Sequence, residues 1–350
     1  MISLDLAGAF TGKGLEFEKN ITIEVNDGII TDVYERRNRG TDLIAMPTLV
    51  NSHMHTGDYA FPEAGNWLGI EELVAPPNGL KHMLLKDTGI ETIRKARVEA
   101  LELSWASGVA AVADFVEGNP DEARVPAAPK HIILGRPGNW FGRMDGLGLP
   151  DVISYNMDVL RKIPMEFGNM PILAHVSETR QLHEINDFKI AMDALPLTAI
   201  VHGTHLTREE IRELAERRVG AVLCPRSNAW FSVGNPDIAS MLDENVLLAL
   251  GTDNAGWLKP DIWREIEAAA LLLRSQKPAF NDPVEIIKMA TLNPLKIFGL
   301  EDTSISKGNR ASFMLINSRP LAIGRSRDVA WSVIKRAGPE SVSKIVVGQQ

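Results

Sequence analysis

The middle of the chain alternates short apolar runs with longer segments in which apolar residues recur at helical spacing. Near-continuous apolar strands separated by helices are typical of a parallel sheet that is covered on both faces. Eight such units in roughly 250 residues predict a (β/α)8 barrel of the TIM type within the α/β class. An open doubly wound sheet is the alternative, although the sequence lacks the GxGxxG and P-loop patterns of its commonest use. The expected strands are 48–53, 109–115, 131–135, 171–176, 198–203, 220–225 and 246–253, with a weakly marked one near 146–151.

Both ends of the chain have a different pattern, with short β-rich runs and turns. Asp27-Gly28 stands between two such runs, which is a strong hairpin signal. The N-terminal piece is too short to bury a core alone, and β-rich sequence returns only after Lys307-Gly308. We therefore predict a small composite β-sandwich domain made of residues 1–46 and 308–350, beside a barrel of residues 47–307.

Charge and cysteine content narrow the range of partners. The net charge of the 350 residues is −8, and no basic patch is interleaved with aromatic residues. Nucleic acid and anionic membranes are therefore not expected as partners, and a small-molecule substrate is. Cys224 is the single cysteine, so intramolecular disulfides are excluded and a cytoplasmic location is expected. No signal peptide and no apolar run of membrane-spanning length is recognised. A homodimer is the default expectation for the assembly.

Residues with metal-binding side chains stand at the carboxyl ends of the predicted strands. Alternate side chains of a strand point to one face, so two histidines with one residue between them look the same way, about 6–7 Å apart. The carboxyl ends of barrel strands are where active sites are built, and imidazoles with a carboxylate can bind one divalent ion and leave a position open for water. The residues are His53, His55, His175, Glu178, His202 and Asp253.

Each of these residues also has an ordinary structural interpretation. His175 fits a hydrogen-bonded core histidine, and Glu178 fits a helix N-terminus, where a carboxylate is stabilising. His202 fits a loop residue bonded to backbone, and Asp253 fits a turn. Four strand ends that each offer a ligand type favour the metal site over these separate readings.

Several segments together resemble a known family. The segments are MPTLVNSHMH, HVSET, VHGTHL, CPRSN followed by LGTDN, and MATLNPLKIFGLED. Their order and spacing resemble the amidohydrolase superfamily, in particular its branch of cytosine deaminase, guanine deaminase and chlorohydrolase-like enzymes. The resemblance spans nearly the whole chain. It implies a metal-dependent catalytic barrel at 47–307.

The resemblance also implies a role for each strand-end residue. His53, His55, His175 and Asp253 are the implied ligands of one divalent ion, Zn²⁺ first and Fe²⁺ second. Asp253 is also implied to take a proton from water, His202 to orient that water, and Glu178 to carry a proton to a ring nitrogen. The sequence has no lysine at the expected end of strand 4, which favours one metal ion over two.

Aromatic and basic residues near the same strand ends are candidate substrate contacts. Trp140 and Trp257 can stack on a planar heterocycle, and Arg136 can hydrogen-bond a polar group. Packing beneath loops is the alternative for the tryptophans, and a surface position is the alternative for Arg136. His82, in the long loop after the first strand, and Asn228, in CPRSN, complete the set.

The resulting functional hypothesis is a hydrolase that acts on C–N bonds other than peptide bonds. We expect it to deaminate an aminated heterocycle, such as a nucleobase or nucleoside derivative, with metal-activated water. A ring-opening amidohydrolase or a chlorohydrolase on the same site is the alternative. A non-catalytic barrel that serves as a scaffold is a more distant one, because such a protein would not need every ligand position filled.

Overall fold

A long parallel sheet forms the centre of the protein. The computed structural model describes residues 1–350 except 37–40, 76–77, 138–141, 168–169 and 349–350. All pairs in the sheet are parallel, and the strand order follows the chain from β7 to β14, with β15 beside β7. The strands are β7 (Leu49–His55), β8 (Val109–Phe115), β9 (Lys130–Gly135), β10 (Gly146–Leu149), β11 (Ile172–Val176), β12 (Ala199–His202), β13 (Gly220–Leu223), β14 (Leu248–Leu250) and β15 (Asp253–Asn254).

The two edges of this sheet meet. Only Gly251 and Thr252 separate β14 at one edge from β15 at the other. The side chain of Asn51, on β7, spans the seam: its amide donates to Thr252 Oγ1 (2.7 Å), and its oxygen accepts from the Thr252 N–H (3.1 Å). Gly251 lies so close to His53 that an added Cβ would be 2.6 Å from the His53 Cβ. The curled parallel sheet is thus eight strands in sequence order, the eighth interrupted between β14 and β15.

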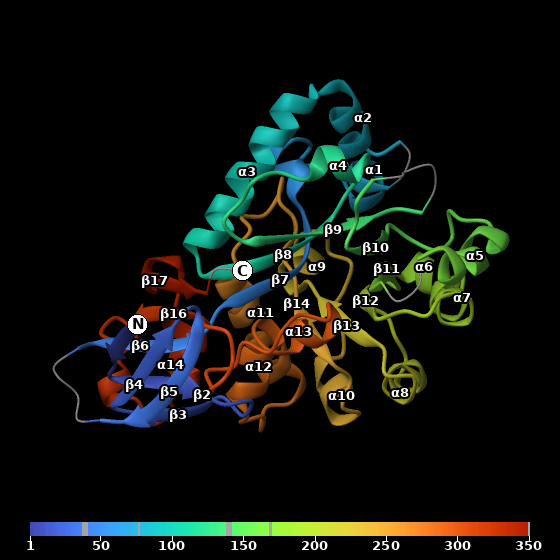
Figure 1. Ribbon diagram of the computed structural model, residues 1–350. Helices are drawn as coiled ribbons and strands as arrows, with labels where there is room; N and C mark the ends of the chain where they lie inside the picture. The colour runs from blue at the N-terminus through green and yellow to red at the C-terminus, as the bar shows by residue number, and fades with distance from the viewer. Residues whose placement is uncertain (37–40, 76–77, 138–141, 168–169, 349–350) are drawn as a thin grey trace.

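Helices follow the strands and cover the sheet (Figure 1). Every residue of β7 and β11 is buried, as expected for strands covered on both faces. None of the helices in the described ranges is long and apolar enough to span a membrane. The helices are α1 (Ile70–Val74), α2 (Leu80–Asp87), α3 (Ile90–Ala106), α4 (Pro120–Ala123), α5 (Met157–Phe167), α6 (Arg180–Glu184), α7 (Asp187–Ala194), α8 (Arg208–Glu216), α9 (Pro225–Trp230), α10 (Ile238–Asp243), α11 (Ile262–Gln276), α12 (Pro283–Ala290), α13 (Asn293–Ile297) and α14 (Val329–Arg336).

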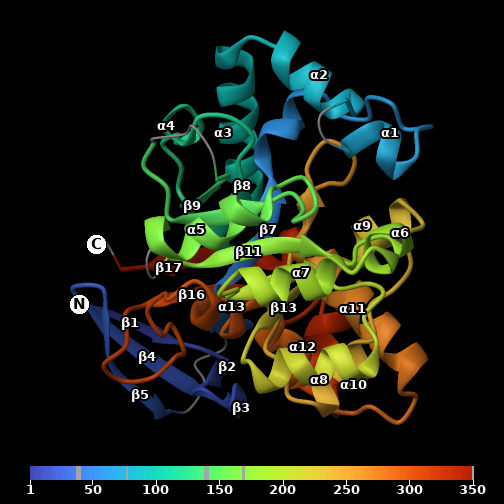
Figure 2. The same ribbon diagram turned by 90° about the vertical axis from the view of Figure 1, so that its right-hand side faces the viewer.

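Strands from both chain ends form two smaller sheets beside the barrel. One has the order β1-β4-β5 and the other the order β17-β16-β6-β2-β3, so N-terminal and C-terminal strands share a sheet. A separate apolar cluster draws residues from both sheets, including Ile23, Ala45 and Phe313. Figure 2 shows both termini on this side of the molecule. The strands are β1 (Ile2–Asp5), β2 (Gly8–Thr11), β3 (Glu16–Lys19), β4 (Ile21–Asn26), β5 (Ile29–Glu35), β6 (Leu43–Pro47), β16 (Ser312–Asn317) and β17 (Val342–Val347).

The predicted strands correspond closely to the observed ones, including the weakly marked strand near 146–151, which is β10. Two helical segments differ. The pattern from 283 to 298 predicts one helix, but the structure has α12 and then α13. The pattern from 179 to 195 predicts a single helix, but the structure has α6 and α7, with Asn186 between them in the left-handed region (φ 61°). Asparagine tolerates this conformation better than most residues, which allows the chain to turn there.

Candidate metal centre and active site

Four of the predicted ligands converge at the carboxyl end of the barrel strands. Each of His53, His55, His175 and Asp253 offers one ligand atom, and these atoms all lie within 4.8 Å of one another. The Asp253 Oδ1 atom is 3.0 Å from His53 Nε2 and 3.5 Å from His55 Nε2. β7, β11 and β15 supply the four side chains, so residues 200 positions apart in the chain meet in one cluster.

The backbone turns sharply where two site residues leave their strands. His202, the last residue of β12, has φ 71°, and Asp253, the first residue of β15, has φ 61°. Residues other than glycine adopt this left-handed conformation at a cost of roughly 1–3 kcal/mol, and such positions gather at functional sites. β15 pairs with β7 in the register Asp253 to Met54, which places the Asp253 carboxylate beside both histidines of β7.

Hydrogen bonds from Nδ1 orient the rings of His55 and His175 so that their Nε2 atoms face the cluster. His175 Nδ1 donates to the Leu149 carbonyl (2.8 Å), and His55 Nδ1 donates to the Phe115 carbonyl (3.1 Å). A donor bond from one ring nitrogen orients a metal-binding histidine and leaves the other nitrogen as ligand. Burial lowers the pKa of His53 to about 4 and that of His175 well below its usual value, which favours the neutral, ligating form. These donors therefore fit one divalent ion.

A second group of side chains stands beside this cluster. Glu178, His202 and Asp253 also have atoms within 4.8 Å of one another. His202 Nδ1 donates to Asn228 Oδ1 (2.9 Å), and His202 Nε2, without a hydrogen-bond partner among the described residues, is 3.5 Å from Glu178 Oε1. The Ser227 hydroxyl donates to the other oxygen of Asp253. The arrangement presents an imidazole nitrogen and two carboxyl groups to one point.

The two carboxyl groups have opposite electrostatic surroundings. Burial raises the pKa of Glu178. Burial also acts to raise the pKa of Asp253, but the hydrogen bond and charge of His53, together with the charges of His202 and His55, hold that pKa well below its usual value. Paired carboxyl groups whose surroundings separate their pKa values are typical of acid–base sites.

A cavity of about 430 Å³ opens directly above the cluster. His55, His175, Glu178 and Asp253 line its inner part. The outer part is lined by α1 and α2 and by the segments that follow β10, β11 and β13. Its volume is within the usual range for a small-molecule site.

The predicted substrate contacts have separate outcomes. Arg136 and His82 line the cavity. Asn228 is buried and contacts His202 rather than the cavity. Trp257 is 5% exposed, and its indole N–H donates to the Ala64 carbonyl, so it packs beneath a loop. Trp140 lies outside the described residues.

A buried ionic network next to His55 was not predicted. Lys81 Nζ, on α2, is 2.8 Å from both Asp58 Oδ2 and Glu117 Oε1. The same Glu117 oxygen is 3.1 Å from His55 Nδ1 and 3.0 Å from Arg136 Nη2. Burial acts to lower the pKa of Lys81, but the two carboxylates outweigh it and raise that pKa.

Part of this network had a sequence signal. Asp58 and Glu117 follow β7 and β8 by a few residues. Polar residues at the carboxyl ends of barrel strands gather at the active-site edge, so both could have been expected near the predicted ligands. Lys81 had none, because a lysine in a loop between elements is ordinarily a surface residue.

A second buried ionic cluster, formed by Arg97, Asp114 and His131, connects β8 to α3 and β9. Arg97 Nη1, on α3, is 2.6 Å from Asp114 Oδ2, and His131 Nε2, on β9, is 2.9 Å from the same oxygen. The Thr56 N–H donates to Asp114 Oδ1 (3.0 Å). Burial acts to raise the pKa of Asp114, but Arg97 and His131 outweigh it and take that pKa well below its usual value. The cluster holds the chain directly after His55.

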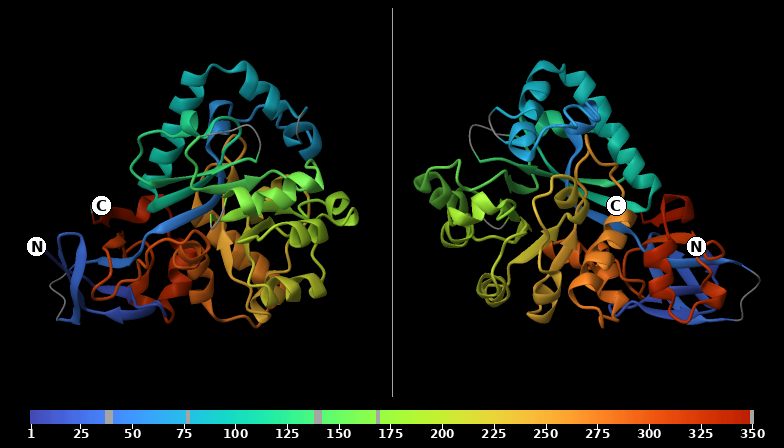
Figure 3. Two further views of the ribbon diagram at one scale, coloured as in Figure 1. Left: turned by 45° about the vertical axis from the view of Figure 1, so that its right-hand side comes forward. Right: turned by 180° about the vertical axis from the view of Figure 1, so that it is seen from behind.

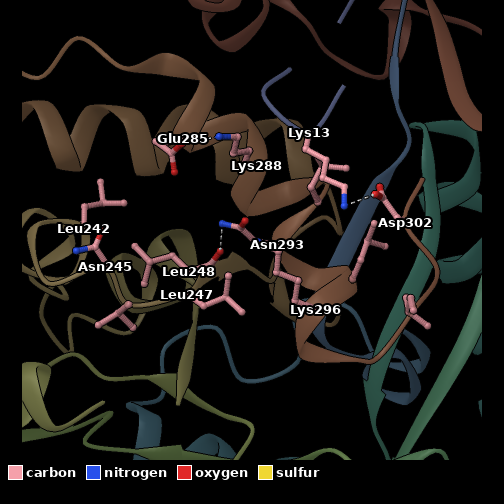
Figure 4. A pocket seen from close by; sticks show the side chains of 14 residues that line it. Lys13, Leu242, Asn245, Leu247, Leu248, Glu285, Lys288, Asn293, Lys296 and Asp302 are labelled. Carbon is pink, nitrogen blue, oxygen red and sulfur yellow. Dashed lines mark hydrogen bonds and ion pairs between the residues drawn. The ribbon is translucent and has the colours of Figure 1, made fainter. Parts of the chain in front are cut away.

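Another cavity, of about 400 Å³, lies at the opposite end of the strands (Figure 4). Leu248, the first residue of β14, lines it, and the Asn293 amide donates to the Leu248 carbonyl (2.9 Å). Its Lys13 is paired with Asp302 (3.3 Å). None of the predicted site residues that the structure describes lines this cavity. It lies at the amino-terminal end of the barrel, where conserved features usually serve stability.

Comparisons with known proteins agree with this geometry. The sequence pattern of the Amidohydrolase family matches residues 144–346. A putative aminohydrolase of Methanothermobacter thermautotrophicus is 28% identical over 367 aligned positions, which cover 94% of this chain and 93% of the relative. A 5-methylthioadenosine/S-adenosylhomocysteine deaminase of Moorella thermoacetica is 24% identical, with 87% and 81% covered.

The fold has a solved counterpart. The crystal structure of an adenosine deaminase from Xanthomonas campestris with bound zinc superposes with a TM-score of 0.78 and 18% sequence identity, covering 99% of this chain and 91% of that one. At this identity the likeness concerns the fold. The four-residue cluster, in a chain that the family pattern matches, supports a divalent metal at this site.

Proposed function

The chain belongs to the amidohydrolase family and is a hydrolase of C–N bonds other than peptide bonds, and we propose that its substrate is an aminated heterocycle of the adenine nucleoside class. One observation carries the proposal: the ligand cluster, Glu178 and His202 meet at the inner end of one cavity of nucleoside size. The name of the Moorella thermoacetica relative supports an adenine nucleoside over other heterocycles.

His53, His55, His175 and Asp253 would hold one divalent ion, zinc before iron because the solved neighbour has bound zinc. The bound ion supplies a nucleophile at neutral pH, because it lowers the pKa of water from about 15.7 toward 7. The donor bonds from His55 Nδ1 and His175 Nδ1 keep both rings in the ligating orientation.

Three side chains would move the protons. Asp253 takes the proton of the attacking water, and its contact with Ser227 fixes the orientation of its carboxylate. Glu178 delivers a proton to the ring nitrogen beside the attacked carbon, which makes that carbon more electrophilic. His202, held through Nδ1 by Asn228, presents Nε2 to the new oxygen. Asp253 then passes its proton to the amino group, and the C–N bond breaks to release ammonia. The new hydroxyl returns a proton to Glu178 and becomes the carbonyl.

Other predictions belong to the same proposal. Arg136 and His82 are proposed to contact the substrate, since both line the cavity. Asn228 would act through His202, Trp257 packs beneath a loop, and Trp140 stays a prediction. The division into a barrel of 47–307 and a composite β-sandwich domain of 1–46 and 308–350 is supported by the sheets that combine both termini. A cytoplasmic location and a homodimer stay predictions.

The test is ammonia release from a panel of purified compounds. Adenosine and its 5′ derivatives are expected to release one ammonia per carbonyl formed, whereas cytosine, guanine and an aminated triazine are expected to release little. Chloride release from a chlorinated triazine would favour the chlorohydrolase alternative, and a ring-opened product that keeps its nitrogen would favour the ring-opening one. Enzyme treated with a chelator and restored with Zn²⁺ provides the matched control.

A further inference from the structure

The Glu117 carboxylate lies beside one of the four proposed metal ligands. Its Oε1 atom is 3.1 Å from His55 Nδ1, the ring nitrogen that also donates to the Phe115 carbonyl. The side chains of His55 and Glu117 are 7% and 9% exposed, so little water competes for this contact. The Nδ1 side of the ring therefore faces two oxygen acceptors, one of which belongs to a carboxylate.

Two cations hold this carboxylate in place. Lys81 Nζ is 2.8 Å and Arg136 Nη2 is 3.0 Å from the same oxygen of Glu117. Lys81 reaches it from α2, and both views of Figure 3 show the cyan segment with α2 and α3 beyond the end of the blue strand β7. Opposite charges at these distances favour the ionised carboxylate. Because both partners are themselves attached to the protein, the Glu117 oxygen has a fixed position at the His55 ring.

The negative charge of Glu117 also offsets a positive charge next to the metal cluster. Three neutral imidazoles and one carboxylate leave a bound divalent ion with a net positive charge in a buried site. The Lys81 ammonium, 3% exposed, contacts the same Glu117 oxygen as His55 Nδ1, so a second positive charge lies close to the ring. Like charges repel strongly where little solvent screens them. Without Glu117, the lysine would therefore oppose metal binding.

We propose that Glu117 is a positioning residue of the metal centre: its carboxylate fixes the His55 ring with the proton on Nδ1, which directs Nε2 at the ion and raises the affinity for it. This inference rests on the proposed function of the same site, because it takes His55 as a metal ligand. A carboxylate at the second nitrogen of a metal-binding histidine orients the ring and makes it a stronger ligand. The alternative is that Glu117 serves only to attach α2 to the barrel through Lys81.

The test is the zinc affinity of Glu117→Gln, which keeps the shape of the side chain and removes its charge. Metal-free protein competes with a chromophoric chelator for Zn²⁺, so the measurement needs no substrate. We expect the Kd for zinc to rise about 10- to 100-fold, the usual effect of losing such a partner. Glu122→Gln, at an exposed position of α4, removes the same charge away from the site and should keep the wild-type Kd. A wild-type Kd in Glu117→Gln would overturn the inference and leave the proposed function intact, whereas a wild-type protein that binds no zinc would overturn both.

A second measurement separates the positioning of His55 from the attachment of α2. With Co²⁺ in place of Zn²⁺, the visible absorption spectrum reports the ligand geometry at the ion. We expect the spectrum of Glu117→Gln to differ from that of the wild type at saturating Co²⁺, when every site is filled. A group that only attaches α2 would change the stability and leave the spectrum unchanged, and that result would overturn the inference.

A shorter acid at the same position covers the case in which Glu117→Gln does not fold. Glu117→Asp keeps the charge that pairs with Lys81 and Arg136, but its side chain withdraws the oxygen from His55 Nδ1. We expect its Kd for zinc to lie between those of the wild type and Glu117→Gln, with an altered Co²⁺ spectrum. A wild-type Kd and spectrum in Glu117→Asp would overturn the inference in the same way.

Discussion

At the scale of single residues, the site depends on backbone conformations that most side chains avoid. His202 and Asp253 both have positive φ, and both present their side chains to the cavity end of the barrel. Strain of this kind persists where surrounding contacts over-determine it. Asn228 holds His202 through Nδ1, and Ser227 together with His53 holds Asp253. Ser227 and Asn228, both in the CPRSN segment, thus orient the two residues with positive φ.

The proposed role of Glu178 predicts a large kinetic effect without a loss of metal. Glu178→Gln keeps the size of the side chain and removes the proton that the reaction needs. We expect kcat to fall by about 10²–10⁴ in the ammonia assay, while metal content per chain stays that of the wild type. Glu184→Gln, at an exposed position on α6, is the control. Full activity in Glu178→Gln would assign the proton transfer to another group.

The proposed ligand role of His175 predicts the opposite pattern. His175→Ala removes one of four donors, so purified protein is expected to contain much less zinc or iron and to show no turnover. His183→Ala is a matched control, since His183 pairs with Glu210 (3.0 Å) away from the cluster. Elemental analysis of both variants is the measurement. Wild-type metal content in His175→Ala would exclude His175 from the ligand set.

At the scale of elements, α2 is attached to the barrel by a single buried lysine. Lys81 is 3% exposed and contacts carboxylates that follow two different strands, β7 and β8. The segment with α1 and α2 therefore has a fixed position at the cavity, which Ile70 and Val74 line. Asp58 also accepts from the Asn254 amide (2.9 Å), so β15 is joined to the same group.

Removal of this lysine is expected to destabilise the protein. Lys81→Met keeps most of the side-chain volume but leaves Asp58 and Glu117 buried without their cation. The cost of breaking a buried ion pair in this way is about 3–5 kcal/mol. Urea unfolding measures it, with Lys86→Met on the exposed face of the same helix as control. A change below about 1 kcal/mol would mean that water reaches the carboxylates and compensates for the loss.

At the scale of the whole molecule, the fold brings both ends of the chain together and closes the sheet. The N-terminal and C-terminal strands share one sheet, and the Asn51 side chain bridges β7 to the chain between β14 and β15. Closure matters for function, because it sets Asp253 beside the two histidines of β7.

The buried Asp114 predicts how the stability of the whole protein responds to acid. Its folded pKa lies well below the ordinary value of 3.8, so its contribution to the free energy of unfolding is present above about pH 4 and is lost as the pH falls below it. The free energy of unfolding of the wild type, measured with urea, should therefore decrease over that range. Asp114→Asn should be less stable at pH 7, and the gap between the two proteins should narrow as the pH falls. A constant gap would show that the ionised carboxylate contributes nothing.

The sequence by itself determined the strands and the residue types at their carboxyl ends. Apolar runs locate the strands, and the polar residue that ends each run is placed at one edge of a parallel sheet. The meeting of His53, His55, His175 and Asp253 at one point could be expected for that reason, whereas the family followed from the resemblance of several motifs together. β10 could be located even though its pattern is weak.

Only the tertiary structure decided the rest, because it depends on which loops meet. The pairing of Lys81 with Asp58 and Glu117 joins segments that no periodicity relates. Trp257 illustrates the same limit. Its place after the last strand suggested a substrate contact, but whether an indole faces a cavity or packs under a loop is set by the neighbour that accepts its N–H, here Ala64. Contacts of this kind arise from long-range packing, and a local sequence pattern does not encode them.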